Sequence, residues 1–453
     1  LFEQLDFAAT SLRETPEKPL GANGLPNLSA AARDRVFYNP QPLASAGKLA
    51  FVFPGSGNHF PAMGRELSAR WPSVFARQDQ RSEFLADQYQ PEHFWTSQLH
   101  ESIYEDHNAL VISHVALCTA LSDLVRSFGV EPQAVSGYSL GESSGLFSSD
   151  AWLDRDGMLR RLRKSTLFTE DLGGACKAAG KVWKRAAGKR VEWILGIVDA
   201  PAEMVRQKLT GKDRAYLLII NTYKECVIGG DRQQVEQLVH ELGCQFIQES
   251  GVTTVHCEVT GPVSKPYREL HLFDTTVPEG IDFYSCARGK SYQPSRDNCA
   301  DTILEQALDT IDYPRVIEQA YADGVRIFVE VGPGNSCSRM INSILGDRPH
   351  LARPSCVANQ NPTSMILRLL AQCLSERVKV DLSVLYPDVP RVAKQPKVQI
   401  ETCIGGVTFT PPLPRKKSVQ PVQSAPVPEP KVAAHVEDKP LASAQPSHKI
   451  ALV

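Results

Sequence analysis

Three features of the sequence predict an α/β protein with a parallel sheet in a large domain and a smaller inserted domain. The continuous apolar run 48–53 has the composition of a strand that is buried on both faces, as strands of parallel sheets are. A helical pattern and a second apolar segment follow it, so strand, helix and strand alternate. Between about residues 191 and 250, shorter elements follow one another in the order βαββαβ, which is typical of a ferredoxin-like domain.

The large domain is predicted from its apolar runs and their spacing. From about 108 to 128, apolar residues recur at steps of three and four, so we expect a helix with one broad apolar face that ends at Gly129. The other elements expected here are strands at 134–136 and 327–331, a polar helix from about 64 to 75 and a helix that extends to Ile344.

The small domain is predicted from shorter apolar runs that alternate with helical patterns. Its expected elements are strands at 193–198, 215–221, 225–228 and 244–248, with helices at 201–209 and 233–242. We therefore place the ferredoxin-like small domain at 191–250 and the large domain at 48–190 and 251–393.

The two ends of the chain are predicted to be linkers. Residues 1–47 are rich in Pro, Ala and polar residues with weak periodicity, which indicates an inter-domain linker. Residues 394–453 form a Pro/Ala-rich mixture that cannot bury enough apolar surface to order itself. Because the chain begins at Leu1 and not at Met, we expect neighbouring domains in one longer polypeptide.

A short glycine-flanked serine motif carries the main functional signal. Gly137-Tyr138-Ser139-Leu140-Gly141 is a G-x-S-x-G sequence between a predicted strand and a predicted helix, which is typical of a nucleophile elbow in a hydrolase-like sheet. The glycines permit a strained turn that projects the serine hydroxyl, and the first N–H groups of the helix face developing negative charge. The alternative is a glycine-rich turn with a capping serine.

A serine hydroxyl is a weak nucleophile until a base accepts its proton. His256 is the best candidate base, because it lies in a hydrophobic segment just after the small domain. The chain returns there from the inserted domain to the large one, a usual position for a cleft.

Composition narrows the class of protein. With 453 residues, 42% hydrophobic and 22% charged, the chain can bury a large core and a satellite core. The formal net charge of −2 gives no indication of a nucleic-acid surface, and no apolar run approaches the roughly 20 residues of a membrane span. The eleven cysteines form no C-x-x-C pair and the eleven histidines show no ligand spacing. We therefore expect reduced thiols, no metal and a cytoplasmic protein.

Four motifs, in this order, resemble the acyl-carrier-protein (ACP) acyltransferase family, which comprises the malonyl-CoA:ACP transacylases and the acyltransferase domains of polyketide and fatty-acid synthases. Residues 51–57 are similar to the family's F-x-F-P-G-Q-G, and residues 137–142 to its G-H-S-x-G-E. His256 stands at the catalytic histidine, and residues 330–334 match the late E-x-G-P-G. The resemblance covers about residues 48–390. The sequences 53–59 and 137–142 look closest to those of the acyltransferase domains of polyunsaturated-fatty-acid-type synthases.

The resemblance implies a role for five residues. Ser139 would be the acyl-accepting nucleophile and His256 its general base. The backbone N–H groups of Leu140 and Ser56 would form the oxyanion hole; Ser56 replaces the family's glutamine, but a backbone donor survives that change. Gln306 would orient the histidine through its main-chain carbonyl.

The resemblance also implies a reaction. Ser139 would take an acyl group from coenzyme A and pass it to the phosphopantetheine thiol of an acyl carrier protein, with no permanently bound cofactor. Extender-selective members carry an arginine about 25 positions after the serine, which pairs with the malonyl carboxylate. Lys164 stands at that position with Arg163 beside it. We predict that Arg163 points into the cleft and that malonyl is preferred; if Lys164 fills the role, a simple acyl group is favoured. The basic cluster 160–164 can equally be a solvated, carrier-facing edge.

Two other functions stay open from the sequence. A serine hydrolase or thioesterase also uses G-x-S-x-G, but it normally adds an acidic residue between serine and histidine. A structural or docking module with a decayed site would keep only the packing of the domain.

Overall fold

The computed structural model describes residues 2–14, 17, 34–186, 191–251 and 253–386. Its two sheets belong to one compact unit, Leu1–Val389. The predicted C-terminal linker, 394–453, lies outside the described residues. The predicted N-terminal linker contains helix α1, Phe2–Glu14. Further along it, Asp34 accepts hydrogen bonds from Arg353 and Arg368.

A sheet of six strands forms the centre of the large domain. The strands are β1 Lys48–Phe53, β2 Ala134–Gly137, β7 Asp282–Ser285, β8 Lys290–Tyr292, β10 Val325–Pro333 and β11 Leu351–Cys356. Their order is β11-β10-β1-β2-β7-β8, and all neighbours are parallel except β7 and β8. β1 lies inside the sheet with five of its six residues buried, as its apolar sequence predicts.

The small domain is a second sheet with two helices. Its strands are β3 Trp193–Val198, β4 Ala215–Thr222, β5 Glu225–Asp231 and β6 Phe246–Gln248, and its helices are α10 Ala202–Leu209 and α11 Arg232–Leu242. The order β6-β3-β5-β4, with antiparallel neighbours, is ferredoxin-like, as predicted. The two-residue strand β9, Ile311–Asp312, returns from the large domain and adds a parallel fifth strand beside β4.

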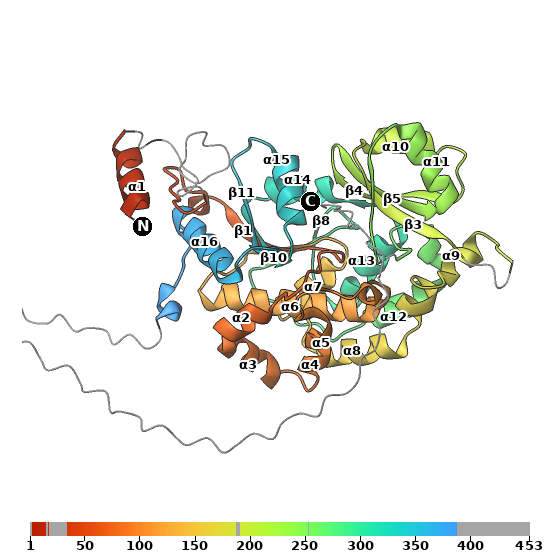
Figure 1. The fold of residues 1–453 in the computed structure, drawn as a ribbon, viewed down its shortest axis with the longest axis horizontal. Helices are drawn as coiled ribbons and strands as arrows, with labels where there is room; N and C mark the ends of the chain where they lie inside the picture. Colours follow the sequence, from red (N-terminus) through yellow and green to blue (C-terminus); the bar gives the residue numbers. More distant parts are fainter. Residues whose placement is uncertain (1, 15–16, 18–33, 187–190, 252, 387–453) are drawn as a thin grey trace, which may run out of the picture. The chain divides into compact units, whose positions relative to one another are not determined.

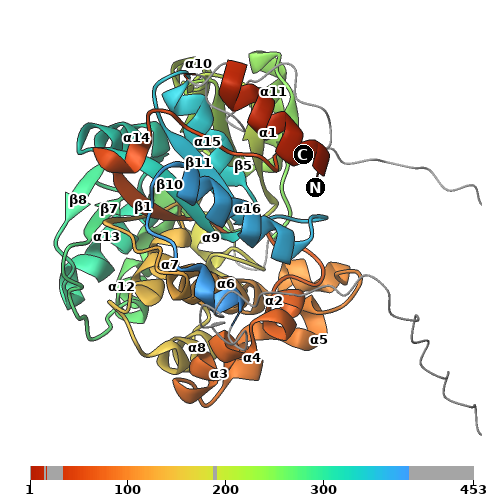
Figure 2. The ribbon, with the colours of Figure 1, turned by 90° about the vertical axis from the view of Figure 1, so that its left-hand side faces the viewer.

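Helices cover both faces of the large sheet. The helices of the described residues not yet named are α2 Arg65–Arg70, α3 Pro72–Gln80, α4 Leu85–Tyr89, α5 Pro91–Phe94, α6 His107–Ser127, α7 Gly141–Ser148, α8 Arg155–Lys164, α9 Lys177–Val182, α12 Ser264–Leu270, α13 Arg296–Leu308, α14 Tyr313–Ala322, α15 Ser336–Leu345 and α16 Pro362–Ser375. Short 3₁₀ helices lie at Leu43–Ser45, Glu101–Glu105, Glu258–Val263 and Leu382–Leu385, and a π-helical turn at Leu167–Asp171. Helices α6 and α7 lie on one side of β1 and β10, and α14 and α15 on the other (Figures 1 and 2).

Two expectations about helices need correction. The helix expected from 64 to 75 is two helices, because Pro72 has no N–H to continue α2 and instead begins α3. The second concerns α6, whose 21 residues are long and apolar enough to cross a membrane, contrary to the expectation that no such run exists. However, 89% of its most apolar window is buried inside the protein, as expected of a core helix.

Candidate active site

Ser139 occupies a strained turn between β2 and α7. Its φ of 54° lies in the left-handed region, which non-glycine residues seldom adopt. A Cβ at Gly137 would lie 2.1 Å from the backbone nitrogen of Glu142, and one at Gly141 would lie 2.0 Å from the carbonyl oxygen of Phe53. Both glycines of the motif are therefore required by the close approach of the turn to itself and to β1.

The structure brings His256 into contact with Ser139 and Gln306. His256 Nε2 lies 2.9 Å from Ser139 Oγ, and His256 Nδ1 lies 2.6 Å from the backbone oxygen of Gln306. Because a carbonyl can only accept, Nδ1 carries the hydrogen and the Nε2 lone pair faces the serine hydroxyl. The Gln306 side chain also donates to the backbone oxygen of Ser139 at 3.2 Å. Gln306 therefore holds both residues in place: its backbone carbonyl binds the His256 ring, and its side chain binds the backbone of Ser139.

A hydrogen bond of the backbone fixes the position of His256, and burial favours a neutral imidazole. Its φ is 67°, and its N–H donates to the carbonyl oxygen of Ala307 at 2.8 Å. Burial lowers the pKa of His256 to about 4, and the hydrogen bond to Gln306 offsets this only in part. At neutral pH the ring is therefore free to accept the hydroxyl proton of Ser139.

Leu140 and Ser56, the residues predicted to form the oxyanion hole, border the same space. Both residues line the cavity beside Ser139, and neither N–H donates to a protein acceptor within the described part of the chain. Leu140 caps the N-terminus of α7, where helix N–H groups are unsatisfied and favour negative charge. Two free donors beside a nucleophile are the arrangement that an oxyanion requires.

The loop that carries Ser56 is fixed by the late motif and by a core histidine. His114 Nε2 lies 2.8 Å from the carbonyl oxygen of Pro54, so this buried histidine is hydrogen-bonded, as expected for a core position. A Cβ at Gly332 would lie 2.6 Å from the Pro54 ring. Glu330, which begins the late motif, accepts the N–H of Ser338 at 2.8 Å. The two motifs are therefore packed against each other.

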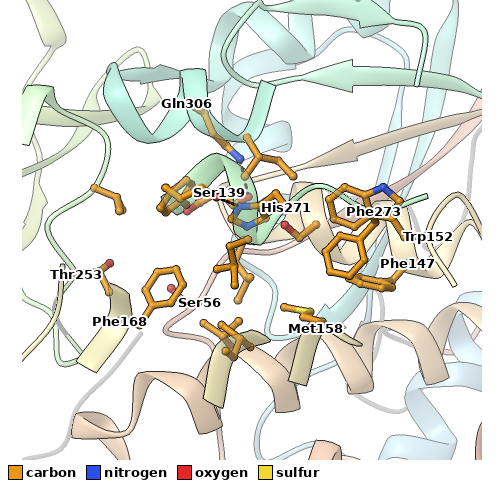
Figure 3. Close-up of a pocket in the computed structure, with 18 of the residues that line it drawn as sticks. Ser56, Ser139, Phe147, Trp152, Met158, Phe168, Thr253, His271, Phe273 and Gln306 are labelled. Carbon is orange, nitrogen blue, oxygen red and sulfur yellow. Dashed lines mark hydrogen bonds between the residues drawn. The ribbon is translucent and has the colours of Figure 1, made fainter. Parts of the chain in front are cut away.

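A cavity of about 720 Å³, its open mouth included, extends from Ser139 and is mostly apolar. Its lining comprises Ser56, Val111, Ser139, Leu140, Ser143, Phe147, Trp152, Met158, Leu162, Phe168, Thr253, Val255, His256, Tyr267, Leu270, His271, Phe273, Ile303 and Gln306. Figure 3 shows Phe147, Trp152 and Phe273 gathered on one side of the cavity and Phe168 and Thr253 on the other. Such a lining suits an apolar group.

The prediction that Arg163 or Lys164 faces the acyl pocket is wrong. Met158 and Leu162, four residues apart on α8, line the cavity, so the residues that follow Leu162 project to another face of the helix. Both basic side chains are exposed, and Arg163 pairs with Asp87 at 3.3 Å on the surface. Among the described residues that line the cavity there is no Lys or Arg.

Three side chains near the site were not assigned a role from the sequence. Tyr138, which precedes the nucleophile, donates to Asn221 Oδ1 of the small domain at 2.6 Å. Ser143 and His271 line the cavity. Helical spacing is a signal for Ser143, which lies four residues after Ser139, whereas no motif marks His271. Within the described residues all ten cysteines are free, and no cluster of three His, Cys, Asp or Glu side chains could hold a metal ion.

The fold is that of the acyltransferase domains of polyketide synthases. The acyltransferase domain from the second module of the salinomycin polyketide synthase superposes with a TM-score of 0.62 at 22% identity, over 76% of each chain. The prediction of a hydrolase-like sheet with an inserted ferredoxin-like domain is confirmed. No model of a known protein family matches the sequence.

Curated relatives carry the names that the motifs predict. A polyunsaturated fatty acid synthase protein of Thraustochytrium sp. is 24% identical over 83% of this chain, which spans only 20% of that protein. Malonyl CoA-acyl carrier protein transacylase of Bacillus subtilis is 24% identical over 66% of this chain and 90% of its own length. The resemblance to the ACP acyltransferases is therefore confirmed, and the chain spans about a fifth or less of the first large synthases it matches.

Proposed function

We propose that this chain is an acyltransferase that moves an acyl group from coenzyme A to the phosphopantetheine thiol of an acyl carrier protein through an acyl-Ser139 intermediate. The observation that carries the proposal is the contact of 2.9 Å between Ser139 Oγ and His256 Nε2 at the wall of an apolar cavity.

In the first half-reaction, Ser139 Oγ attacks the thioester carbonyl while its proton passes to His256 Nε2. The carbonyl oxygen becomes negative beside the N–H groups of Leu140 and Ser56. When the tetrahedral intermediate collapses, the C–S bond breaks and the coenzyme A thiolate takes the proton from His256. The serine then carries the acyl group as an ester.

In the second half-reaction, His256 accepts the proton of the carrier thiol, and the thiolate attacks the acyl-serine ester. The serine oxygen leaves and recovers its proton from His256. The partner of His256 Nδ1 is the backbone carbonyl of Gln306 and not a carboxylate. This dyad supports transfer over the hydrolase alternative, whose folds normally add an acidic third residue.

The acyl group in this proposal has no carboxylate. A malonyl carboxylate in a buried pocket needs a cationic partner, and the described lining of the cavity supplies none. Arg161 of α8 lies over the ring of Phe273, a residue of the lining, but it is already engaged, because it donates to the carbonyl oxygens of Leu270 and Leu272. The preference for malonyl that the sequence suggested is therefore replaced by an acyl group without a carboxylate.

The partners in this proposal are an acyl carrier protein and neighbouring synthase domains of the same polypeptide, in the cytoplasm, with no resident cofactor. The names of the relatives support them: one is part of a fatty acid synthase and one is a transacylase of an acyl carrier protein.

Intact-protein mass spectrometry after incubation with acetyl-, butyryl-, octanoyl- and malonyl-CoA tests the proposal. We expect an acyl adduct on Ser139 that a carrier thiol removes faster than water does. Ser139→Ala should abolish the adduct, and His256→Ala should slow its formation by about 10²- to 10⁴-fold. Ser144→Ala is the matched control, because Ser144 is a buried serine of α7 outside the cavity lining. Loading that survives Ser139→Ala, or release to water that outpaces transfer, would contradict the proposal.

A further inference from the structure

Two buried polar side chains that line the cavity each carry one polar atom without a hydrogen-bond partner among the described residues. His271 is 8% exposed and Ser143 is 3% exposed, and both line the cavity. His271 Nδ1 lies 2.8 Å from the carbonyl oxygen of Tyr267, whereas Nε2 has no partner among the described residues. Ser143 Oγ has none either, and neither atom is sealed off by other protein atoms. Both atoms are therefore available to a group inside the cavity.

The protonation of His271 follows from its one hydrogen bond. The Tyr267 carbonyl can only accept, so Nδ1 carries the hydrogen and Nε2 presents a lone pair. Burial lowers the pKa of His271 to about 4, and the nearby positive charge of Arg161 also lowers it. At neutral pH Nε2 is therefore an acceptor, and Ser143 supplies a hydroxyl that can donate.

The chemistry of this pair selects among acyl groups. A hydroxyl on the acyl chain can donate its hydrogen to Nε2 of His271, and a hydroxyl can also accept one from Ser143. A ketone has only an acceptor, a carboxylate has no hydrogen for Nε2, and a methylene has neither. Because Phe147, Trp152 and Phe273 line the same cavity, an unmatched polar group there would stay unpaired.

We propose that His271 and Ser143 form a polar subsite that recognises a hydroxyl group on the acyl chain, so that the preferred donor is a hydroxyacyl thioester. This specificity rests on the proposed acyl transfer, but it concerns the acyl pocket and not the chemistry at Ser139. His271 and Ser143 are therefore specificity-determining residues.

Binding to the Ser139→Ala chain separates the subsite from the chemistry. The probes are butyryl-CoA, its 2-, 3- and 4-hydroxy derivatives and malonyl-CoA, with affinities measured by titration calorimetry. We expect at least one hydroxybutyryl-CoA to bind about 5- to 10-fold more tightly than butyryl-CoA, the ratio that one added hydrogen bond supports. His271→Phe should remove this preference, Ser143→Ala should reduce it, and His271→Gln, which keeps an acceptor, should retain part of it.

Ser144→Ala, which changes the neighbouring serine outside the cavity lining, should leave the preference intact. Equal affinity for all butyryl probes, or a preference that survives His271→Phe, would overturn the proposal. So would a malonyl preference that is lost in His271→Phe, because His271 would then be a protonated partner of a carboxylate. A hydroxyl preference without any acyl-Ser139 in the unaltered chain would refute the acyl transfer and support the subsite.

Discussion

Ser139 and His256 both hold left-handed backbone conformations, with φ of 54° and 67°. Conformations of this kind cost of order 1–3 kcal/mol each in non-glycine residues and persist only where the surrounding structure imposes them. Here the surroundings are the glycine-flanked turn for Ser139 and the Ala307 carbonyl for His256. Both residues whose side chains meet at 2.9 Å are among the ten described non-glycine residues with positive φ, and their meeting in one site supports a functional pair over a capping serine.

The low pKa of His256 predicts how acyl loading depends on pH. A base must be unprotonated, and a pKa of about 4 keeps Nε2 unprotonated above about pH 5. The single-turnover rate of Ser139 acylation should therefore stay nearly constant from pH 5.5 to 7.5 and fall as the pH drops through about 4. Stopped-flow loading with a preferred acyl-CoA would measure it, with circular dichroism at each pH as the control for folding. A rate that rises tenfold between pH 5.5 and 7 would instead indicate a base with an ordinary histidine pKa.

At the scale of elements, a chain of hydrogen bonds joins the elbow to the small domain. The Tyr138 hydroxyl donates to Asn221 of β4 at 2.6 Å, and Asn221 donates to Glu225 of β5 at 2.9 Å. Glu225 in turn receives two hydrogen bonds from Arg339 of α15, at 2.7 and 3.0 Å. The Tyr138 ring also packs edge-on against Tyr313 of α14, with centroids 5.3 Å apart. The residue before the nucleophile therefore couples the two sheets.

A double-mutant cycle tests this coupling. Tyr138→Phe should lower the free energy of unfolding by about 1–2 kcal/mol, because it leaves Asn221 Oδ1 buried without its donor. Combined with Asn221→Ala, the two changes should cost less than their sum, with a coupling energy of about 1 kcal/mol. Urea denaturation of the four proteins measures the cycle. Strict additivity would show that the hydroxyl does not hold the two domains together.

The elements were predictable where the sequence carries a local signal. β1, β3 and β4 lie within a residue of their predicted bounds, because continuous apolar runs reveal buried strands. The pair of Ser139 and His256 was also predictable, since the motif and the return of the chain from the small domain both mark the site. The residues that line the pocket were not predictable. Arg163 lies at about the expected distance from Ser139 along the sequence, but that distance does not say which face of a helix a residue occupies. On α8 the side chain of Leu162 lines the cavity, whereas the side chain of Arg163, the next residue, is exposed to solvent.

The proposed polar subsite of His271 and Ser143 could not be predicted from the sequence, for a related reason. His271 lies one residue beyond α12, and Ser143 lies on α7. Only the tertiary structure places both side chains in one cavity, and only the Tyr267 carbonyl decides which nitrogen of His271 is free. A linear motif records none of these relations.

At the scale of the whole molecule, the fold keeps a carboxyl group buried directly behind the elbow. Glu142 is 4% exposed on α7, and hydrogen bonding from Thr302 and from the backbone of Cys286 offsets the burial of its carboxyl group only in part. Burial raises the pKa of this carboxyl group from 4.5 to about 7. A negative charge there would be poorly solvated, so the folded state favours the protonated form.

The resulting link between folding and pH has a definite sign. A carboxyl group with a raised pKa in the folded state binds its proton more tightly there than in the unfolded chain. Its contribution to stability is therefore complete below about pH 4.5 and is lost as the pH rises through 7. A rise of the pKa from 4.5 to about 7 corresponds to about 3 kcal/mol, which is lost between about pH 4.5 and 8.

Glu142→Gln removes this titration while it keeps the size of the side chain. Relative to the unaltered chain, the variant should gain stability as the pH rises, by about 3 kcal/mol between pH 4.5 and 8. Because other titrating groups are common to both proteins, their contributions cancel in the difference. Urea denaturation of both proteins at intervals of half a pH unit measures that difference. A constant difference across the range would mean that Glu142 keeps an ordinary pKa in the folded protein and that the charge is accommodated behind the elbow.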